Sequence, residues 1–335
     1  MDQPLAESRT LGKPNGENRT TPLISVVVAT HNRADRLKNL LRSFDEQTVP
    51  PDEFEVIVVD DGSTDETDQL LSENRTAIVI RNEFAEGPAR ARQKGWQTAR
   101  GQFVAFTDDD CRADSRWLEF LLKAHRANPG VIVQGRTQPE PEETLRLANP
   151  LARTIRVDAL GPFFQTCNVS YPRALLEEVG GFNSRIPLPS CEDADLAMRA
   201  LATGCGAVFA DEAVISHAIE EQSLSEAIVA ANRWASMVAL VAEHRELRKA
   251  FPWRGFVWRE THGRLILALL GIGIATLSRR RLFLLWVVPY LTLRNGWSPR
   301  GMSKTAAALP KLTLVDIAEL TVLTRASIRT RRLFL

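Results

Sequence analysis

Three consecutive carboxylates, Asp108, Asp109 and Asp110, stand in the segment FTDDDCRAD, directly after a hydrophobic run. Like charges at this spacing repel one another, so a folded chain needs a positive partner for them. A divalent cation is one such partner, because Mg²⁺ and Mn²⁺ prefer oxygen ligands and are often shared between one or two carboxylates and substrate phosphate. A solvated acidic turn is the alternative interpretation. The triplet therefore predicts either a site for a metal-bound diphosphate or an exposed loop.

A second acidic pair, Asp60 and Asp61, ends the apolar part of VIVVDDGS. Their carboxylates can accept hydrogen bonds from a nucleobase N–H or from ribose hydroxyls. An Asp-Gly turn followed by a helix cap explains the same residues without a ligand. The two roles are compatible, since one aspartate can contact a ligand while Gly62 and Ser63 turn the chain.

The pattern of apolar residues predicts the elements that carry these acids. Continuous β-branched runs alternate with helical spacing in the first half, which is typical of a mostly parallel, doubly wound α/β sheet flanked by helices. We expect strands at 23–30, 54–63, 77–82 and 102–110, and helices at 33–47 and 87–100. Ligands of such sheets bind at the carboxyl ends of the strands. The polar residues that follow those ends are expected at one edge: Thr30, His31, Asn32, Asp60, Asp61 and the acid triplet.

The second half predicts further elements with less regular alternation. We expect one strand at 131–135, and a strand followed by a helix that ends at the Gly-Gly pair within 163–182. A helix with acids at its start is predicted at 190–206, and an i,i+4 ion pair between Asp195 and Arg199 would support it. Two short strands in 207–218 and a long amphipathic helix at 223–244 complete the prediction.

The chain resembles the family 2 glycosyltransferases, on segments that occur in the following order: ISVVVATHNR, VIVVDDGSTDET, GPARARQKGW, FVAFTDDDCRAD, TCNVSYPR, VGGF and CEDADLAMRALATG. The resemblance covers about residues 23–218 and implies the GT-A fold. It also implies inverting transfer of a sugar from a nucleotide donor, often UDP-linked. The hypothesis that the acceptor is a hydroxyl of a glycan or lipid-linked sugar depends on the C-terminal part of the chain alone, which is described below. Mg²⁺ or Mn²⁺ is the implied cofactor.

The resemblance also implies roles for individual residues. Asp110 matches the direct metal ligand of the family's DxD motif, with Asp108 as a second metal candidate and His217 as a further one. Asp108 or Asp109 would meet the ribose. The segment Gly87–Arg92 matches the chain beside the uridine, with Arg90 or Arg92 facing the nucleotide. The complete set of implied nucleotide-binding residues is Thr30, Asn32, Arg33, Asp60, Asp61, Gly87, Arg90, Arg92, Asp108 and Asp109.

Glu192 and Asp193 match the acceptor motif of the family, in which the aspartate is the general base. A sugar hydroxyl is a poor nucleophile near neutral pH, so a carboxylate must take its proton as the new bond forms. The departing diphosphate develops charge, which a divalent cation stabilises. Acids in the first turn of a helix also stabilise the helix dipole, which is the alternative role for this pair.

The C-terminal part carries an unusual charge. Residues 253–335 contain 14 lysines and arginines against three acids, an excess of +11, so the rest of this nearly neutral chain is acidic. Arg279, Arg280 and Arg281 separate two apolar runs, 265–276 and 282–293, each too short to span a bilayer alone. Apolar runs with adjacent arginines and interfacial aromatics favour an anionic membrane surface as the partner rather than nucleic acid. An ordinary helical hairpin packed on protein is the alternative.

These observations predict four segments: a flexible leader at 1–22, a nucleotide-sugar half at 23–135, an acceptor half at 136–250 and a basic, partly apolar, helical extension at 251–335. The leader has no apolar stretch of the kind that secretion signals contain, and the four cysteines form no CxxC pair. We therefore expect a location on the cytoplasmic side of the cell membrane. Two other functions remain open: a sugar-phosphate nucleotidyltransferase and a non-catalytic protein that keeps the fold.

Overall fold

The computed structural model describes residues 10–11, 21–183, 190–295 and 302–335. It contains two compact units, which we describe separately. The first comprises the chain up to Thr144 together with Thr154–Ile219, and the second comprises Leu145–Arg153 and Glu220–Leu335. Of the predicted leader, the described residues include Thr10–Leu11, a two-residue strand (β1) that pairs with β4. The other residues before 21 lie outside the described part of the chain.

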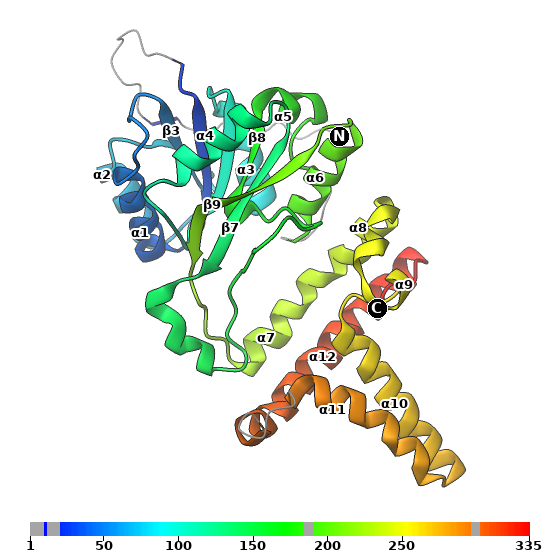
Figure 1. Ribbon diagram of the computed structural model, residues 1–335. Helices are drawn as coiled ribbons and strands as arrows, with labels where there is room; N and C mark the ends of the chain where they lie inside the picture. Colours follow the sequence, from blue (N-terminus) through cyan, green and yellow to red (C-terminus); the bar gives the residue numbers. More distant parts are fainter. Residues whose placement is uncertain (1–9, 12–20, 184–189, 296–301) are drawn as a thin grey trace. The chain divides into compact units, whose positions relative to one another are not determined.

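The first unit is built on one mixed sheet with helices on both faces (Figure 1). The strand order is β1-β4-β3-β2-β5-β8-β7-β9-β6. Its parallel part consists of β2 (Ile24–Thr30), β3 (Phe54–Asp60), β4 (Ile78–Arg81) and β5 (Phe103–Asp108). The register pairs Thr30 with Asp60 and Ala29 with Asp108. Because parallel strands in this register end together, the polar residues that follow them reach one edge, as predicted.

Helices α1 (Ala34–Asp45) and α4 (Trp117–Ala127) cover one face of this sheet. Leu37, Leu40 and Phe44 of α1 are buried against Val26 and Val28, and each such side chain contributes about 1.5–3 kcal/mol when fully buried. The short helix α2 (Thr67–Glu73) lies between β3 and β4 in the sequence and contacts α1.

Helix α3 (Pro88–Thr98) covers the opposite face and approaches it closely. A Cβ atom at Gly95 would lie 2.4 Å from Cγ1 of Val27, so this position needs glycine for the helix to rest on the sheet. The close approach brings the inner side of α3, including Arg92, over the carboxyl ends of the strands.

The remaining strands are β6 (Cys111–Ala113), β7 (Ile132–Pro139), β8 (Val169–Pro172) and β9 (Ala207–His217). β8 is antiparallel to both β5 and β7, while β9 is parallel to β7 and antiparallel to β6. The prediction of two short strands in 207–218 is wrong, because β9 is continuous. Its pairing with β7 has an irregularity between Gly135 and Arg136, and its C-terminal residues Ile215–His217 pair with both β7 and β6.

Asn168 ties the irregular part of the sheet together. It ends the 3₁₀ turn η2 (Thr166–Asn168) and is fully buried. Its Oδ1 accepts a hydrogen bond from Nε1 of Trp117 at 2.9 Å, and its Nδ2 donates to the carbonyl oxygens of Arg136 and Ala213 at 2.7 and 2.9 Å. One amide side chain thus satisfies three buried polar groups where the strand pairing is interrupted.

Helices α5 (Arg173–Val179) and α6 (Glu192–Ala202) follow β8 and contact each other. Gly180, at φ 75°, ends α5 in the left-handed conformation. The predicted pair between Asp195 and Arg199 is confirmed, with Nε and Oδ2 2.9 Å apart. Arg199 also donates to the carbonyl oxygen of Gly181 at 2.6 Å, which holds α6 against the end of α5.

The second unit is helical. Its elements include α7 (Leu224–Ala230), α8 (Ala235–Glu243), α9 (Pro252–Gly255), α10 (Glu260–Ser278), α11 (Val288–Asn295) and α12 (Met302–Thr330). Four 3₁₀ segments complete it or lead into it: η1 (Pro141–Ala148), η3 (Ala231–Trp234), η4 (Arg245–Ala250) and η5 (Arg281–Val287). The long helix predicted at 223–244 is therefore three consecutive segments. It begins at a capping box, in which Ser223 and Glu226 satisfy each other's backbone N–H groups.

The second unit contains Leu145–Arg153 and the chain from Glu220 onward, so residues 220–250 lie within it. The segment predicted as the C-terminal part of the acceptor half thus belongs, by its contacts, to the helical unit. Two stretches are long and apolar enough to cross a membrane by length and composition: Leu224–Glu243 and Glu260–Ser278. The second exceeds the 12-residue run noted above, since α10 has 19 residues and a length of about 28 Å. Core helices of soluble proteins pass the same criterion.

Candidate active site

Among the described residues, two arginines are the positive partners of the acid triplet. Arg92 donates from Nη2 to Oδ1 of Asp108 at 2.7 Å. Arg33 donates from Nη1 to Oδ2 of Asp110 at 2.7 Å and to Oδ1 of Asp109 at 3.3 Å. The alternative of an exposed acidic loop is excluded, because Asp109 and Asp110 are buried. The triplet is instead a set of inward-facing carboxylates with ion-pair partners.

The carboxyl of Asp109 has a raised pKa. Burial raises the pKa of its carboxyl to about 7, and the charge of Asp110 adds to the rise, while Arg33 opposes it. Thr30, at the end of β2, donates from Oγ1 to Oδ2 of Asp109 at 2.8 Å. The predicted nucleotide residue Thr30 therefore orients a member of the triplet.

Arg92 connects the acid triplet with the second acidic motif. In addition to Asp108, its Nη1 donates to Oε1 of Glu192 at 2.9 Å. Burial alone would lower the pKa of Arg92, but the carboxylates of Asp108 and Glu192 outweigh burial and raise it above its usual value. Two motifs more than 80 residues apart thus meet on one guanidinium. Both terminal nitrogens of Arg92 are used by carboxylates, whereas Arg90 is exposed on the same helix.

Glu192 and Asp193 form the first turn of α6, after Cys191 in the left-handed conformation. Asp193 is half-buried, and its Oδ1 accepts the N–H of Ala194 at 2.8 Å. Burial raises the pKa of Asp193, the charge of Glu192 adds to the rise, and the Ala194 N–H and Arg92 oppose it. A carboxylate with a raised pKa is a stronger base than an ordinary aspartate. Oε2 of Glu192 is buried and has no hydrogen-bond donor among the described residues.

Asp110 lies beside His217 because β6 and β9 pair Cys111 with His217. Nε2 of His217 is 3.5 Å from Oδ1 of Asp110, and its Nδ1 lies 2.9 Å from the carbonyl oxygen of Ala218. Asp110, Cys111 and His217 each place a ligand atom within 4.8 Å of the others.

This donor set fits a divalent cation held by oxygen and nitrogen. Burial and the charges of Asp110 and Asp108 raise the pKa of Cys111 well above its usual range. The Cys111 thiol is therefore protonated in the absence of a cation, and binding through its sulfur would first require loss of that proton, since metals bind the thiolate. A carboxylate and an imidazole remain, with the second oxygen of Asp110 on Arg33. Such ligands suit ions of the Mg²⁺ and Mn²⁺ class better than ions that require sulfur.

Asp61 organises the loop that precedes α3. Its Oδ1 accepts from Nδ2 of Asn82 at 2.7 Å and from the N–H of Glu86 at 2.9 Å, and its Oδ2 accepts the N–H of Gly87 at 2.7 Å. Gly87 is the residue before α3 and has a φ of 96°. Three donors from this chain thus hold the carboxylate that the resemblance assigns to the nucleobase. Through its bonds to the N–H groups of Glu86 and Gly87, Asp61 holds the start of the segment that the resemblance assigns to the nucleotide.

The other predicted nucleotide residues form the rim of the same edge. Oδ1 of Asp60 accepts the N–H of Ser63 at 3.0 Å, which makes the turn that the sequence indicated. Asn32 is exposed, at φ 54°, and its Oδ1 accepts the N–H of Thr64 at 2.7 Å. The structure therefore brings together Thr30, Arg33, Asp60, Asp61, Arg92 and the triplet, with His217, Glu192 and Asp193 beside them.

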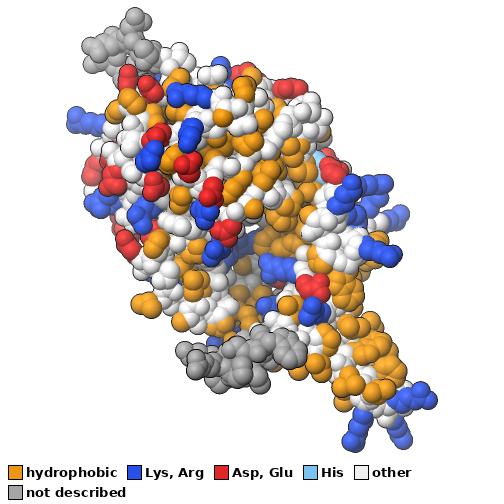
Figure 2. Space-filling view, viewed as in Figure 1, with side chains coloured by type: hydrophobic (Ala, Val, Ile, Leu, Met, Phe, Trp, Pro, Cys, Tyr) orange, Lys and Arg blue, Asp and Glu red, His pale blue; other side chains and the backbone are white. Residues whose placement is uncertain are grey.

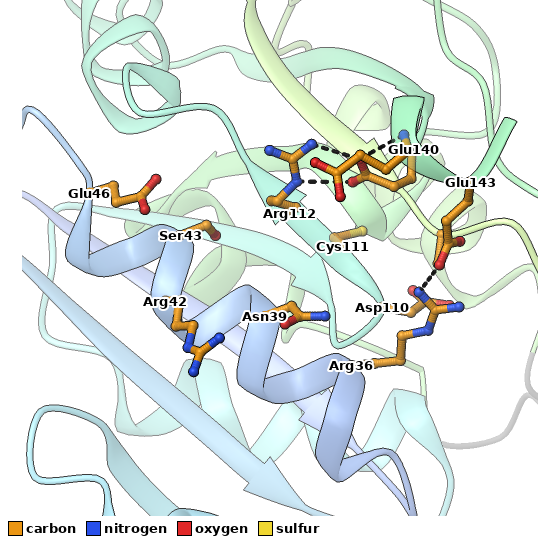
Figure 3. Close-up of a pocket in the computed structure, with 12 residues that line it drawn as sticks. Arg36, Asn39, Arg42, Ser43, Glu46, Asp110, Cys111, Arg112, Glu140 and Glu143 are labelled. Atoms are coloured by element: carbon orange, nitrogen blue, oxygen red, sulfur yellow. Dashed lines mark hydrogen bonds and ion pairs between the residues drawn. The ribbon is translucent and has the colours of Figure 1, made fainter.

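A pocket of about 300 Å³, lined in part by Asp110, lies between α1 and β6 (Figure 3). No motif in the sequence predicts this pocket. Arg112 binds Glu140 through two hydrogen bonds, at 3.0 and 2.6 Å, and Arg36 reaches Glu143. The i,i+3 spacing of Arg36, Asn39 and Arg42 along α1 could have indicated one polar face, but not what lies opposite it.

Comparisons with known proteins agree with this geometry. Residues 25–181 match the profile of Glycosyl transferase family 2. The chain is 30% identical over 226 residues to a validoxylamine A glucosyltransferase of Streptomyces hygroscopicus subsp. limoneus, covering 56% of this chain and 50% of that protein. It is 30% identical over 211 residues to a pre-mycofactocin glycosyltransferase of Mycobacterium tuberculosis, covering 58% and 42%. The chain thus spans about half the length of the curated relatives it matches.

Two solved structures share the fold over most of the chain. A mannosyltransferase from Pyrobaculum calidifontis, in complex with GDP-Man and Mn²⁺, superposes with a TM-score of 0.60 at 21% identity, covering 92% of this chain and 91% of that one. Staphylococcus aureus TarS 1–349, in complex with UDP, superposes with a TM-score of 0.52 at 20% identity, covering 92% of each chain. The predicted GT-A architecture is confirmed. This chain thus carries a match to Glycosyl transferase family 2 over residues 25–181, is similar to glycosyltransferases over about half of their length, and shares the fold of two solved glycosyltransferases.

Proposed function

We propose that this protein transfers a sugar, with inversion, from a nucleoside-diphosphate donor to a hydroxyl group of a glycan or lipid-linked acceptor. The observation that carries the proposal is the double ion pair of Arg92, which brings Asp108 and Glu192 to one place. A donor-side acid cluster and an acceptor-side acid pair at one sheet edge are what a displacement between two substrates requires.

The residues divide into two groups with different tasks. Asp110 and His217 would hold a divalent cation, with Asp108 near it, and the bound ion would supply Lewis-acid stabilisation of the leaving diphosphate. Thr30 and Arg33, with the loop that Asp61 organises, would bind and orient the nucleotide. Asp193 would take the proton of the acceptor hydroxyl, and Glu192 would receive a hydrogen bond from a neighbouring acceptor hydroxyl at its unpaired Oε2.

The proposed donor is a sugar linked to uridine diphosphate or to another nucleoside diphosphate. TarS was solved with UDP and with UDP-GlcNAc, and the Pyrobaculum enzyme was solved with GDP-Man and Mn²⁺. All of these ligands contain the diphosphate that the proposed cation site would bind. We propose UDP-sugars first and leave the sugar itself to experiment.

Nucleotide release tests the proposed chemistry. The protein is incubated with Mn²⁺ or Mg²⁺ and a panel of nucleotide sugars, and the liberated nucleoside diphosphate is measured with and without a chelator. We expect release from at least one UDP-sugar, its loss when the chelator is added, and its loss in Asp110→Asn because a carboxylate that can hold the cation is missing. A parallel assay with nucleoside triphosphate and sugar phosphates measures pyrophosphate. Pyrophosphate release without sugar transfer would favour a nucleotidyltransferase, and no release from any donor would favour a binding protein.

We also propose that the second unit attaches the protein to the cytoplasmic face of a membrane. α10 and η5 form a hairpin whose two arms touch at Gly271, where a Cβ atom would lie 2.5 Å from the carbonyl oxygen of Phe283. Hydrophobic side chains cover the outside of this hairpin and basic side chains lie at its tip (Figure 2). The exposed apolar residues of the hairpin include Leu269, Leu270, Leu277, Leu282, Leu284 and Leu285.

The base of the hairpin is held by buried polar groups. Nε2 of His262 lies 2.9 Å from Oε2 of Glu319 on α12, and the hydroxyl of Tyr290 donates to Oδ2 of Asp316 at 2.7 Å. The tip of the hairpin carries the arginine triplet 279–281. A rigid base and an apolar, basic tip fit a segment that lies among lipid headgroups and pairs with their phosphates.

Vesicle binding tests the attachment. Leu277 is 90% exposed on the hairpin and Leu145 is 88% exposed outside it, so Leu277→Glu and Leu145→Glu form a matched pair. We expect Leu277→Glu combined with Leu282→Glu to weaken binding to vesicles containing anionic lipid by about tenfold or more, because each buried leucine contributes about 1.5–3 kcal/mol. Leu145→Glu should bind as the unaltered protein does. Equal binding by all variants would contradict the proposal. A lower oligomeric mass of the hairpin variant in the absence of vesicles would also contradict it, because it would show that the hairpin contacts a second copy of the chain.

A further inference from the structure

One nitrogen of Arg33 occupies the position between two buried carboxylates. Nη1 lies 2.7 Å from Oδ2 of Asp110 and 3.3 Å from Oδ1 of Asp109. His217 also lies beside these two acids: its Nε2 is 3.5 Å from Oδ1 of Asp110, the oxygen that Arg33 does not contact. The chain therefore supplies its own positive charge at the carboxylate that best fits a divalent cation.

Arg33 and a cation compete for the same group. Asp110 has a limited number of lone pairs that point into the site, and its Oδ2 already accepts a charged N–H. A second positive charge within a few ångströms of a guanidinium is repelled, most of all where burial weakens screening by water. Occupation of Asp110 by a cation therefore requires Arg33 to move.

The structure allows Arg33 to move and keeps the acids in place. The side chain of Arg33 is 37% exposed, whereas those of Asp109 and Asp110 are 8% and 6% exposed. Asp109 stays fixed through its hydrogen bond with Thr30. Arg92, the other arginine of the cluster, is only 9% exposed and is held by two carboxylates from different elements. Of these two arginines, only Arg33 is exposed enough for its side chain to turn into solvent.

A released Arg33 would lie at the mouth of the proposed nucleotide site. Its guanidinium offers a planar set of N–H donors that matches the oxygens of a phosphate group. A nucleoside diphosphate that arrives with a cation brings the negative charge that replaces Asp109 and Asp110 as the partner of this arginine.

We propose that Arg33 is an exchangeable counter-ion: it neutralises Asp109 and Asp110 before substrate binds, yields Asp110 to the divalent cation, and then pairs with the phosphates of the bound nucleoside diphosphate. The proposal rests on the proposed function, and it adds a direct coupling between cation and nucleotide. The cation binds weakly alone because it must displace an arginine. It binds more tightly with a diphosphate, because the displaced arginine then has a new partner.

Cation binding without nucleotide tests the first half of the proposal. The electron paramagnetic resonance signal of free Mn²⁺ is titrated with unaltered protein, Arg33→Gln and Arg33→Lys. We expect Arg33→Gln to bind Mn²⁺ about tenfold more tightly, because the competing charge is gone, and Arg33→Lys to stay near the unaltered protein, because a positive charge is kept. Mn²⁺ should also raise the melting temperature of Arg33→Gln by more than that of the unaltered protein. Equal or weaker Mn²⁺ binding by Arg33→Gln overturns the proposal.

Nucleotide binding tests the second half. With Mn²⁺ at saturation, titration calorimetry with UDP should show about tenfold weaker binding to Arg33→Gln, and unchanged UDP affinity overturns the exchange. Arg173→Gln is the matched control, because Arg173 pairs with an acid at 2.7 Å but follows β8 at the opposite edge of the sheet. It should leave both affinities unchanged. Neither measurement requires turnover, so failure of the donor panel would contradict the proposed function alone, while an unaltered Mn²⁺ affinity in Arg33→Gln would contradict the exchange alone.

Discussion

Replacing Asp193 by asparagine is expected to lower turnover by about 10²- to 10⁴-fold, the usual contribution of a general base, while leaving binding of Mn²⁺ and UDP unchanged. Asparagine has nearly the same shape and keeps an oxygen for the N–H of Ala194, but it cannot take a proton from an acceptor hydroxyl. Turnover is measured as sugar transferred at saturating donor, and nucleotide binding is measured by calorimetry. The separation of the two readouts distinguishes a base from a residue that shapes the donor site.

The pH dependence of turnover provides a second check on Asp193. Burial and the charge of Glu192 raise the pKa of this carboxyl, and only its ionised form is a base. Turnover of the unaltered protein should therefore fall as the pH drops through that raised pKa, and this acidic limb should vanish in Asp193→Asn. The contribution of Asp193 to the stability of the fold depends on pH in the opposite direction. A carboxyl with a raised pKa in the folded state binds more protons there than in the unfolded chain, so its contribution to stability decreases as pH rises toward that pKa.

Asp211→Asn is the control for this substitution, because Asp211 is an exposed aspartate on β9 whose ion pair with Arg136 lies at the surface. It should keep full turnover. Normal transfer by Asp193→Asn would remove Asp193 as the base and direct attention to Glu192, whose Oε2 lacks a partner among the described residues.

Replacing Arg92 by glutamine should destabilise the fold by about 3–5 kcal/mol, because removal of one partner leaves two largely buried carboxylates, Asp108 and Glu192, without a counter-charge. The free energy of unfolding is measured by urea denaturation.

Arg90→Gln is the matched control, since Arg90 is exposed on the same helix, two residues earlier. It should leave the free energy of unfolding within about 0.5 kcal/mol of the unaltered protein, as is usual for surface positions. An equal effect of the two substitutions would show that Arg92 does not hold the two acidic motifs together.

Local sequence patterns were sufficient to predict the parallel half of the sheet. The runs at 24–30, 54–60 and 103–108 are apolar on both faces, which is typical of central parallel strands, and polar residues stand at the end of each. The i,i+4 pair of Asp195 and Arg199 was likewise predictable, because both residues lie on one helix at fixed spacing. The order of the motifs along the chain was enough to indicate the resemblance to Glycosyl transferase family 2, whose profile matches residues 25–181.

Patterns failed where pairing is irregular or where partners are distant. β9 was divided in two because its polar middle, around Asp211 and Glu212, looks like a turn when only the strand itself is considered. The helix predicted at 223–244 is interrupted at η3, although the residues there favour a helix. In both cases the contacts of the neighbouring elements override the local preference.

The sequence alone determined the resemblance to the family, through the order of its motifs. It also determined the alternation of strands and helices and the edge at which the acidic residues meet, because both follow from short-range spacing and from the rule that parallel strands end together. Only the tertiary structure decided how the charges are paired: Arg33 on Asp109 and Asp110, and Arg92 between Asp108 and Glu192. The partners in these pairs are separated by between 16 and 100 positions in the chain. Buried charges must be neutralised wherever the fold brings them together, and that choice depends on distances in space, which spacing along the chain does not contain.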